Sequence, residues 1–396
     1  MYLKVSIQAF YATEETGAVF NCMRDDRRFM RANVNIWPGG IGAAIKSLSQ
    51  QEPADLLIVE ADKGGEEFLR SLDELADVCD PSTKVILLGV DNDILLYRDL
   101  LAMGVDEYLP CPVKTEQLLP VVDRLFASED DGARSRILAF VGARGGVGSS
   151  SVAVNTAYCL AEQMGEEVVL LDLDLSFGTA ALSLNLLPNQ TIADALVQSA
   201  RLDDVMLERF LSSYGDNSRL SVIAAPGQLD GGAELDMGAF DLLMKVVSRR
   251  ASFVILDLPH LWSNWMYEVL VGATEVVITT HPDLVGLRAA KNFFEQLTTK
   301  RGVDAPTRLV MNEVGASRST ELAAKEFEKA VSVRPSIVVP NNPTLFGTAM
   351  NDGEPVVKID PRSEAAKEFS QLAAIVSGRR PAAVKRPRFR LFRGRG

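Results

Sequence analysis

A glycine-rich stretch at residues 142–151 carries the clearest chemical signal in the chain. It reads Gly-Ala-Arg-Gly-Gly-Val-Gly-Ser-Ser-Ser, follows the apolar run 137–141 and precedes a helical pattern at 152–164. A strand, a glycine-rich loop and a helix in this order can cradle phosphate groups. Glycines let backbone N–H groups turn inward, and the helix N-terminus adds positive partial charge. The stretch therefore predicts a phosphate-binding loop.

This loop departs from the strict nucleotide-binding pattern GxxxxGK[ST]. When the loop is aligned on Gly148, Ala143 stands at the first glycine and Ser149 stands at the lysine. The lysine normally neutralises charge on the β- and γ-phosphates, which a short, uncharged serine cannot do. Losing one charge in a dry phosphate site removes several kcal/mol of stabilisation. The loop therefore predicts phosphate binding with slow chemistry or none.

The elements that must position this loop belong to a domain at residues 137–377. Continuous apolar runs are typical of strands that are buried on both faces of a parallel sheet. The candidate strands are 137–141, 168–171, 220–224, 253–256, 276–279, 309–311 and 337–339. Their alternation with helical patterns predicts an α/β domain with a parallel sheet.

Residues 1–127 show the same alternation on a smaller scale and predict a separate five-stranded parallel sheet. The clearest strands and helices are 5–7, 56–59, 85–88, 96–103 and 118–126. Helices are expected on both faces of this sheet. The polar segment 128–136, which contains Gly132, has the composition of a linker between the two domains.

The end of the first domain resembles the last third of a response-regulator receiver domain, which has a flavodoxin-like parallel sheet. A helix, then Gly104, then a short strand with a Pro-flanked turn carry this resemblance. Phosphoryl-accepting receivers use an aspartate acceptor, an acidic pair for Mg²⁺, a hydroxyl and a lysine. This chain departs at all four positions: Glu60 for the acceptor, Gln8-Ala9-Phe10 for the acidic pair, Gly89 for the hydroxyl and Cys111 for the lysine.

These departures predict a receiver-like domain that does not accept a phosphoryl group and serves in docking or dimerisation. Asp62 remains an alternative acceptor if the strand register is shifted by two residues. Cys111 is interpreted as a structural cysteine rather than a redox switch.

The glycine-rich loop resembles the deviant loop xKGGxGK[ST] of the MinD/ParA family, which are dimeric P-loop ATPases with a second, "signature" lysine. Arg144 stands at the signature position, and Ser150 stands at the Mg²⁺-binding hydroxyl. Four further segments match the family in the same order: 171–175 with Asp172 and Asp174, 253–259 with Asp257, 310–313 with Asn312, and 339–355 with Pro340.

The resemblance implies ATP and Mg²⁺ as cofactors, and it implies a role for each matching residue. The nucleotide contacts would be Gly145, Gly146, Val147, Gly148, Ser149, Ser150, Ser151, Asn312 and Pro340, with Asn312 reading the adenine. Mg²⁺ would be held, partly through water, by Ser150, Asp172 and Asp257. Asp174 would position the attacking water, and Arg144 would reach the phosphates across a homodimer. The alternative is that the fold survives while the site binds nothing.

His260 follows the Asp257 segment at the position called switch II in these relatives. A surface loop whose Trp262 and Trp265 pack or face a partner is favoured over a catalytic base at His260.

A receiver-like domain without phosphorylation residues, joined to a MinD-like domain without its lysine, is similar to the CpaE/TadZ family. This resemblance covers nearly all of residues 1–377. Members assemble pili of the Tad-type (type IVc, Flp) system. It implies a cytoplasmic localisation factor, peripheral to the inner membrane or at a cell pole. Its implied partners are the Tad secretion ATPase and components of the inner-membrane platform.

Two other classes compete with this interpretation. The first is a ParA/MinD-type partition or positioning ATPase with active hydrolysis and DNA or membrane binding. The second is an electron carrier similar to nitrogenase reductase, which needs paired cluster cysteines. The four cysteines of this chain are scattered and form no CxxC pair: Cys22, Cys79, Cys111 and Cys159.

Charge is distributed unevenly along the chain. Its 396 residues carry a net charge of −12, but the segment 379–396 holds eight basic residues and no acidic one. Residues 1–378 therefore hold 33 basic and 53 acidic residues, a balance of −20 that opposes DNA binding. The basic, flexible tail 378–396 is expected to contact an anionic membrane surface or an acidic partner protein, or to act only in solubility.

The sequence contains no run of about 18 apolar residues, so it predicts no membrane span. The start of the chain does not resemble a signal peptide.

Overall fold

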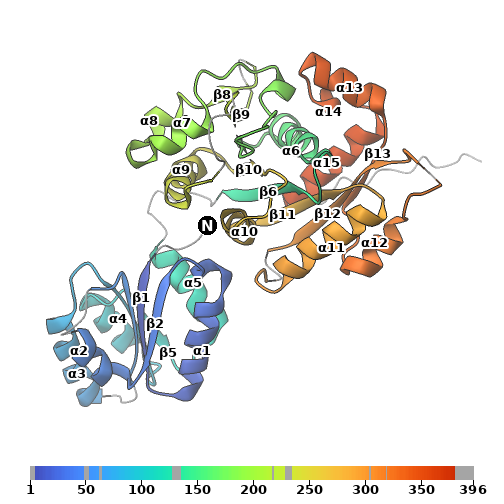
Figure 1. Cartoon of the computed structure of the whole chain (residues 1–396). Helices are drawn as coiled ribbons and strands as arrows, with labels where there is room; N and C mark the ends of the chain where they lie inside the picture. Colours follow the sequence, from blue (N-terminus) through green and yellow to red (C-terminus); the bar gives the residue numbers. More distant parts are fainter. Residues whose placement is uncertain are drawn as a thin grey trace, which may run out of the picture. The chain divides into compact units, whose positions relative to one another are not determined.

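The structure is a computed structural model that describes residues 5–48, 53–61, 65–126, 135–215, 218–227, 234–302, 305–317 and 319–379. The chain divides into two compact units, Met1–Gly132 and Ala133–Gly396 (Figure 1). This division falls inside the segment 128–136 proposed as a linker. All of the basic tail beyond Arg379 lies outside the described residues.

The first unit is built on a five-stranded parallel sheet of order β2-β1-β3-β4-β5. The strands are β1 (Ser6–Tyr11), β2 (Asn33–Pro38), β3 (Leu56–Glu60), β4 (Lys84–Gly89) and β5 (Glu107–Pro110). The helices are α1 (Glu14–Asp25), α2 (Gly40–Leu48), α3 (Gly65–Val78), α4 (Ile94–Ala102) and α5 (Thr115–Leu125). The predicted five-stranded parallel sheet is therefore present.

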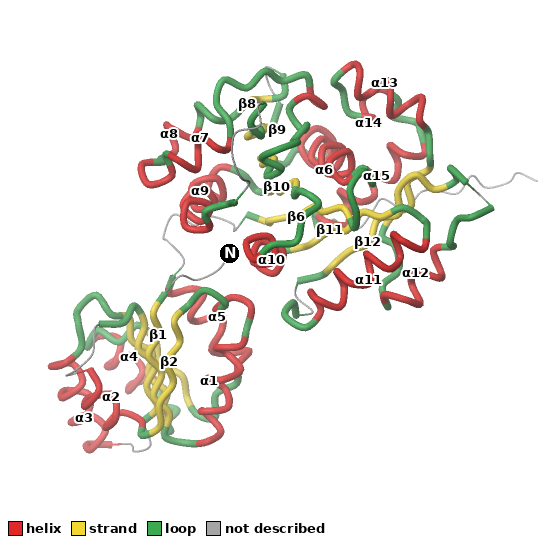
Figure 2. The backbone as a smooth tube through the Cα atoms, in the orientation of Figure 1, coloured by secondary structure: helices red, strands yellow, loops and turns green. Residues whose placement is uncertain are grey.

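Helices cover both faces of this sheet (Figure 2). Phe20 of α1 and Val122 of α5 pack in one apolar cluster, and Phe68 of α3 and Leu100 of α4 pack in another. Two separate clusters on one sheet are what a βαβ order produces, because successive crossovers can place helices on either face.

The second unit contains an eight-stranded sheet of order β13-β12-β11-β6-β10-β7-β9-β8, in which only the β8–β9 pair is antiparallel. The strands are β6 (Arg136–Gly142), β7 (Val168–Asp172), β8 (Ser212–Ser213), β9 (Leu220–Ile223), β10 (Phe253–Asp257), β11 (Glu275–Thr280), β12 (Thr307–Val314) and β13 (Ile337–Pro340). All seven predicted strands are present. β6 starts one residue earlier than expected, inside the predicted linker.

Helices also lie on both sides of the second sheet (Figures 1 and 2). They are α6 (Ser149–Tyr158), α7 (Ile192–Val197), α8 (Asp204–Leu207), α9 (Met237–Arg250), α10 (Asn264–Gly272), α11 (Leu284–Thr298), α12 (Ala324–Val331), α13 (Pro343–Asp352), α14 (Val356–Ile359) and α15 (Glu364–Val376). The predicted helix 152–164 begins earlier than expected, at Ser149. A π-helical turn, Cys159–Gln163, continues α6, so the helix changes geometry within its length. Cys159 is buried in the core, as a structural cysteine should be.

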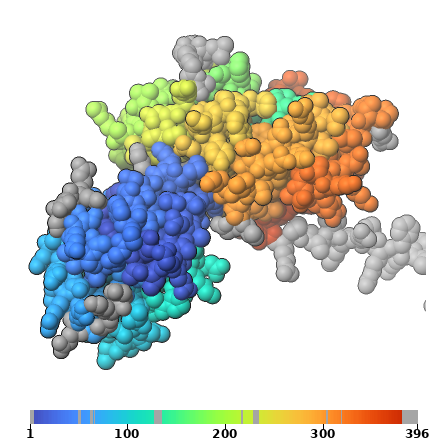
Figure 3. Space-filling view, turned by 60° about the horizontal axis from the view of Figure 1, so that its bottom comes forward, coloured from blue at the N-terminus to red at the C-terminus, as the bar shows by residue number. Residues whose placement is uncertain are grey.

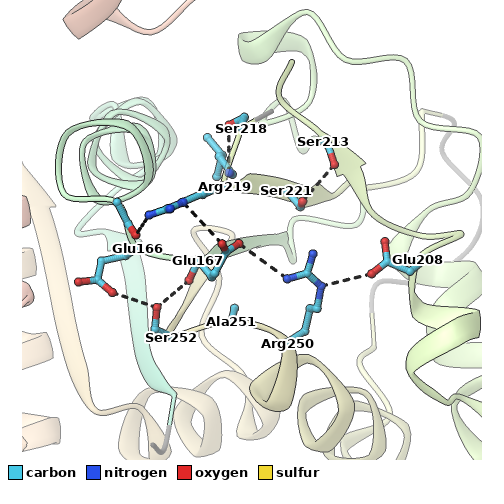
Figure 4. A network of polar contacts seen from close by, with 12 residues as sticks. Glu166, Glu167, Glu208, Ser213, Ser218, Arg219, Ser221, Arg250, Ala251 and Ser252 are labelled. Carbon is cyan, nitrogen blue, oxygen red and sulfur yellow. Dashed lines mark hydrogen bonds and ion pairs between the residues drawn. The ribbon is translucent and has the colours of Figure 1, made fainter. Parts of the chain in front are cut away.

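A polar network joins the amino-terminal ends of β7, β9 and β10 (Figure 4). Glu167 forms ion pairs of 3.7 Å with both Arg219 and Arg250. Glu166 accepts a hydrogen bond from Ser252 and pairs with Arg379. Because these groups are half exposed, each pair contributes at most about 1 kcal/mol. Arg379 therefore lies at the amino-terminal ends of these strands, and the glycine-rich loop follows the opposite, carboxyl end of β6.

None of the helices in the described parts of the chain combines the length and the apolar character that a membrane span requires.

Candidate functional site

The glycine-rich loop joins the central strand β6 to α6, and two of its glycines have a backbone that favours glycine. Gly146 has a φ of +76° and Gly148 a φ of +80°. A Cβ atom on Gly148 would also lie 2.4 Å from Nδ2 of Asn312. Gly148 is the N-cap of α6, and no side chain caps the first turn. The loop thus leaves the N–H donors of the helix N-terminus for a ligand.

Asn312 holds the loop from the end of β12. Its side chain is 4% exposed, and Nδ2 donates a 2.9 Å hydrogen bond to the carbonyl of Val147. Pro340 ends the neighbouring strand β13 and lies opposite Val314. The structure thus places Asn312 against the glycine-rich loop, while its expected contact with adenine stays a prediction.

Asp172 and Asp257 end the adjacent strands β7 and β10 and lie opposite each other in register. Both side chains are 1% exposed. Asp172 accepts hydrogen bonds from the N–H groups of Asp174 (3.2 Å) and Ala180 (3.0 Å). Neither carboxylate oxygen of Asp257 has a hydrogen-bond partner at normal distance among the described residues.

The environment of this pair opposes its negative charge. Burial raises the pKa of Asp172 to about 6, and backbone hydrogen bonds oppose the rise. Burial raises the pKa of Asp257 well above its ordinary value, and the charge of Asp172 adds to the effect. The Ser150 hydroxyl acts in the opposite direction on Asp257. Two coupled buried carboxylates without a cation are costly, and a divalent ion would remove that cost.

The residues present fit Mg²⁺ beside a bound phosphate. Two carboxylates and the Ser150 hydroxyl supply hard oxygen ligands, which Mg²⁺ prefers. Within the described residues, no group of three or more His, Cys, Asp or Glu side chains could hold a metal ion. Water and phosphate oxygens would therefore supply the remaining ligands, as is usual for this ion. Among the described residues, Ser149 Oγ and Thr279 Oγ1 are also buried without a hydrogen-bond partner, so unpaired polar atoms gather at the carboxyl ends of these strands.

We predict opposite effects of Asp257→Asn with and without the metal. In EDTA at slightly alkaline pH, the free energy of unfolding of the second unit should rise by about 1–3 kcal/mol, because an uncompensated buried charge is removed. A raised carboxyl pKa means that the folded state loses stability as pH rises, and asparagine cannot ionise. Added Mg²⁺ should stabilise the native protein but not the variant. Urea unfolding with and without Mg²⁺ measures both effects.

The half-buried Asp174 provides the matched control for this experiment. Asp174→Asn should change the stability in EDTA much less. A variant at Asp257 that is less stable than the native protein in EDTA, or that still responds to Mg²⁺, contradicts the metal site.

Asp174 begins the turn after β7 and lies two residues beyond Asp172. Its Oδ1 accepts a 3.0 Å hydrogen bond from the N–H of Phe177, and its carbonyl accepts one from Gly178 (2.8 Å). A Cβ atom on Gly178 would lie 2.4 Å from Asp172 Oδ1, so the turn packs tightly against the carboxylate pair. The structure thus brings Asp174 to the edge of the same site.

Arg144 is held by its own chain. Its guanidinium donates to Asp283 Oδ2 at 2.8 Å and contacts His281 Nδ1 at 2.9 Å. Arginine can only donate, so Nδ1 of His281 is the acceptor in this contact. Nε2 lies 3.4 Å from a carboxylate oxygen of Glu313. Arg144 must therefore leave Asp283 before it can reach a phosphate elsewhere.

Glu313 adopts an unusual backbone conformation that supports this chain of contacts. Its φ is +56°, and the pairing of β12 with β13 changes register between Met311 and Val314. Such a conformation persists only where the surroundings impose it. The end of β12 therefore contacts the loop directly through Asn312 and Val147, while Glu313 lies beside His281, which in turn contacts Arg144 of the loop.

The sequence interpretation missed the roles of His281 and Asp283. Both follow β11, which is a direct neighbour of β6 in the sheet. The carboxyl ends of neighbouring parallel strands meet at one edge, so this position was the available signal. His260 also reaches the loop, because its Nδ1 lies 3.2 Å from the carbonyl of Gly142. Trp265 is buried, and the half-exposed Trp262 packs edge-on against Phe293.

Glu60 stands at the position of the phosphoryl acceptor in the first unit, and both of its carboxylate oxygens accept hydrogen bonds. Glu60 Oε2 accepts from the N–H groups of Ala12 (2.6 Å) and Thr13 (2.8 Å). Its Oε1 accepts from the hydroxyls of Thr13 and Thr16, both at 2.7 Å. Burial raises the pKa of the adjacent Cys111 thiol to about 11, so it is not a reactive thiolate at neutral pH. Asp62, the alternative acceptor, lies outside the described residues.

Comparison with known proteins covers both units. A family model described as "AAA domain" matches residues 135–303. The sporulation initiation inhibitor protein Soj of Bacillus subtilis is 26% identical over 261 residues, which is 61% of this chain and 98% of that protein. The structure of a ParA family ATPase from Chlorobium tepidum covers 60% of this chain and 97% of that chain, with 23% identity and a TM-score of 0.55. This likeness shows the fold.

The first unit has a nearer relative. The structure of a pilus assembly protein CpaE from Caulobacter crescentus is 40% identical over the N-terminal part of this chain. It covers 32% of this chain and 97% of that chain, with a TM-score of 0.31. The identity extends over nearly the whole length of that relative. Together with the MinD/ParA relatives of the second unit, it shows that the chain belongs to the CpaE-like family of MinD/ParA-type P-loop ATPases.

Proposed function

We propose that this chain is an ATP-binding localisation and assembly factor for a Tad/Flp-type (type IVc) pilus. ATP with Mg²⁺ occupies the site in the second unit, and the loaded unit forms a homodimer. The dimer brings the pilus machinery to a polar or membrane site. The observation that carries nucleotide binding is the buried pair Asp172–Asp257 beside a loop that leaves its N–H donors for a ligand. The name of the Caulobacter crescentus relative supports the pilus role.

The residues of the site divide the work of binding. The first turn of α6 and the glycine-rich loop bind phosphate oxygens through backbone N–H groups. Ser150, Asp172 and Asp257 hold Mg²⁺, partly through water. Bound Mg²⁺ supplies neutralisation of phosphate charge. Asn312 and Pro340 lie at the ends of β12 and β13, where an adenine base is proposed to be read.

Hydrolysis is proposed to be slow or absent. Asp174 can orient a water at the edge of the site, but Ser149 brings no charge to the phosphates. Arg144, the nearest alternative cation of the loop, is paired with Asp283 within its own unit. Its guanidinium can bind phosphate oxygens bidentately once that pair breaks. The phosphates of ATP bound to a second copy would compete with Asp283 for the Arg144 guanidinium.

We expect ATP with Mg²⁺ to convert the chain into a nucleotide-dependent dimer through Arg144. Arg144→Ala should retain ATP binding within about threefold but raise the dimer dissociation constant at least about tenfold. Light scattering after size separation, with ATP, ADP or no nucleotide, measures the association. Lys291→Ala, which removes an exposed cation of α11 paired with Glu295 at 3.6 Å, serves as the control. Equal nucleotide-driven association of the native and Arg144→Ala chains contradicts this role.

The partners proposed for the dimer are the Tad secretion ATPase and the inner-membrane platform. The tail 379–396 offers a contact to anionic lipid or to an acidic partner protein. Its first residue, Arg379, contacts Glu166 and the carbonyl of Met164 in the second unit. The cytoplasmic, polar or membrane-peripheral placement follows from this proposal. A charge balance of −20 over residues 1–378 does not favour the DNA-binding alternative.

A further inference from the structure

A cluster of charged and titratable side chains lies beside the glycine-rich loop and takes no part in the proposed Mg²⁺ site. Its members are Arg144 of the loop, His281 and Asp283 after β11, and Glu313 at the end of β12. The part of the chain from His281 to Glu313 is yellow-orange to orange, and this colour forms a continuous area of the surface in the space-filling view (Figure 3). The Glu313 side chain is half exposed, so the cluster borders solvent.

A single nitrogen atom of Arg144 serves two acceptors. Its Nη2 lies 2.9 Å from Nδ1 of His281 and donates to Oδ2 of Asp283 at 2.8 Å. The two acceptors therefore lie close together around one donor. An imidazole that accepts at Nδ1 is not the imidazolium cation, because both ring nitrogens of the cation are donors. Arg144 thus keeps His281 uncharged for as long as this contact lasts.

The other ring nitrogen of His281 faces a carboxylate. Nε2 is buried without a hydrogen-bond partner among the described residues, and it lies 3.4 Å from Oε2 of Glu313. Glu313 reaches this position through a backbone φ of +56°, which a non-glycine residue adopts only where its surroundings impose it. The structure therefore keeps a negative charge where it would pair with an imidazolium.

The charged groups around His281 come from every element packed against it. The loop supplies Arg144, the start of α11 supplies Asp283, and the end of β12 supplies Glu313. The segment before α12 supplies Glu321, whose carboxylate accepts hydrogen bonds from two backbone N–H groups of the preceding turn. Of these four groups, Arg144 alone is a cation. Its departure would leave the imidazole among three carboxylates, an environment that favours a positive charge on the ring.

From this arrangement we infer that His281 is a positioning residue that exchanges the Arg144 guanidinium for a proton. When the guanidinium leaves for a phosphate, a proton from solvent binds the vacated Nδ1. The new N–H then donates to Asp283 Oδ2 in place of Nη2, and Nε2 faces Glu313. One cation replaces another, so the net charge of the cluster does not change. This inference rests on the proposed role of Arg144 at the phosphates of a second copy, and it adds a proton as a further ligand of that step.

The sign of the pH dependence follows from the exchange. Histidine is the side chain whose charge ordinarily changes between pH 5 and 8. The associated chain binds more protons than the free chain, so association should strengthen as the pH falls from 8 to 6. An imidazolium in the free chain acts in the same direction, because it cannot accept a hydrogen bond from Arg144 and repels the guanidinium.

Sedimentation velocity of the full chain with ATP and saturating Mg²⁺, at pH 8 and at pH 6, tests the inference. The dissociation constant of the native dimer should be at least about tenfold lower at pH 6. His281→Gln keeps an acceptor for Arg144 but binds no proton in this range, so its constant should differ by less than about threefold between the two pH values. His260→Gln changes the second of the chain's two histidines and is the matched control. It should keep the tenfold ratio between the two pH values.

A second pair of variants tests the carboxylate that faces Nε2. Glu313→Gln removes its charge, so the ratio of the two dissociation constants should fall below the native ratio. Glu295→Gln removes an exposed carboxylate of α11 that pairs with Lys291, and it should leave the ratio unchanged. Circular dichroism at both pH values checks that each variant remains folded.

The possible failures separate the inference from the function on which it rests. Equal dissociation constants of the native dimer at pH 8 and pH 6 would overturn the proton exchange and leave the nucleotide-dependent dimer intact. The same pH dependence in the His281→Gln and native chains would also overturn the exchange alone. Absence of association with ATP and Mg²⁺ at both pH values would contradict the proposed role of Arg144 and the exchange with it.

Discussion

Glu60→Ala should lower the free energy of unfolding of the first unit by about 2–4 kcal/mol. The carboxylate is 3% exposed and accepts four hydrogen bonds at 2.6–2.8 Å. Two of these come from the backbone N–H groups of Ala12 and Thr13, just before α1, and two come from the hydroxyls of Thr13 and Thr16. Alanine removes every acceptor at once. The Thr16 hydroxyl, which is buried, is then left without this partner.

Urea unfolding of the full chain measures this effect, with the transition of each unit fitted separately because the chain has two units. Only the first transition should move. Glu15→Ala, in the exposed first turn of the same helix, should change stability by less than about 0.5 kcal/mol. Glu60→Gln keeps the length of the side chain but places an amide NH₂ group against two donors. Its loss of stability should therefore lie between those of Glu60→Ala and Glu15→Ala. An unchanged first transition in Glu60→Ala would show that the carboxylate is not a structural anchor.

Gly148→Ala should weaken binding of ATP with Mg²⁺ at least about tenfold. A left-handed backbone costs a non-glycine residue about 1–3 kcal/mol. The new Cβ would also lie 2.4 Å from Asn312 Nδ2, so either the loop or Asn312 must move. That movement breaks the hydrogen bond from Asn312 to the carbonyl of Val147 and disturbs the N–H donors of the loop. Titration of the variant with ATP and Mg²⁺ measures the loss.

Gly215→Ala is a control that introduces similar backbone strain without a steric clash. Gly215 has a φ of +79°, close to the +80° of Gly148, but a Cβ there would meet nothing within 4 Å. It should cost stability and leave the affinity for ATP unchanged. Equal affinities of the Gly148→Ala and native chains would mean that the brace of Asn312 on the loop has no role in binding.

Local patterns predicted most of the fold because the strands of both sheets are apolar runs. β3 and β10 are buried at every position, as a two-sided parallel sheet requires. The strands that escaped prediction lack this pattern. β2 lies at a sheet edge and alternates exposed with half-buried residues, and β8 consists of two serines. An edge strand with one exposed side carries no continuous apolar run.

The candidate site was predicted in its parts but not in its internal contacts. Asp172 and Asp257 were predicted as site residues because segments 171–175 and 253–259 resemble the MinD/ParA family. The structure places the two residues opposite each other in register. The pairing of Arg144 with Asp283 joins residues 139 positions apart, and no local pattern records such a contact. The positive φ of Glu313 likewise depends on tertiary context and leaves no mark in composition.

The contacts of Arg144 add to the effect of having Ser149 at the lysine position of the loop. Ser149 removes one positive charge from the phosphate site, and Asp283 holds the next cation away from it. Both features favour a protein that keeps nucleotide rather than one that turns it over quickly.

Isothermal titration of the nucleotide-free chain with ATP, in Mg²⁺ and again in EDTA, tests the central claim most directly. The central claim is that the buried pair Asp172–Asp257 and the glycine-rich loop form one site for ATP with Mg²⁺. It predicts saturable binding of about one ATP per chain in Mg²⁺, with an affinity at least about tenfold weaker in EDTA. Absence of binding at millimolar ATP in Mg²⁺ would show that the fold survives without its ligand and would contradict the account.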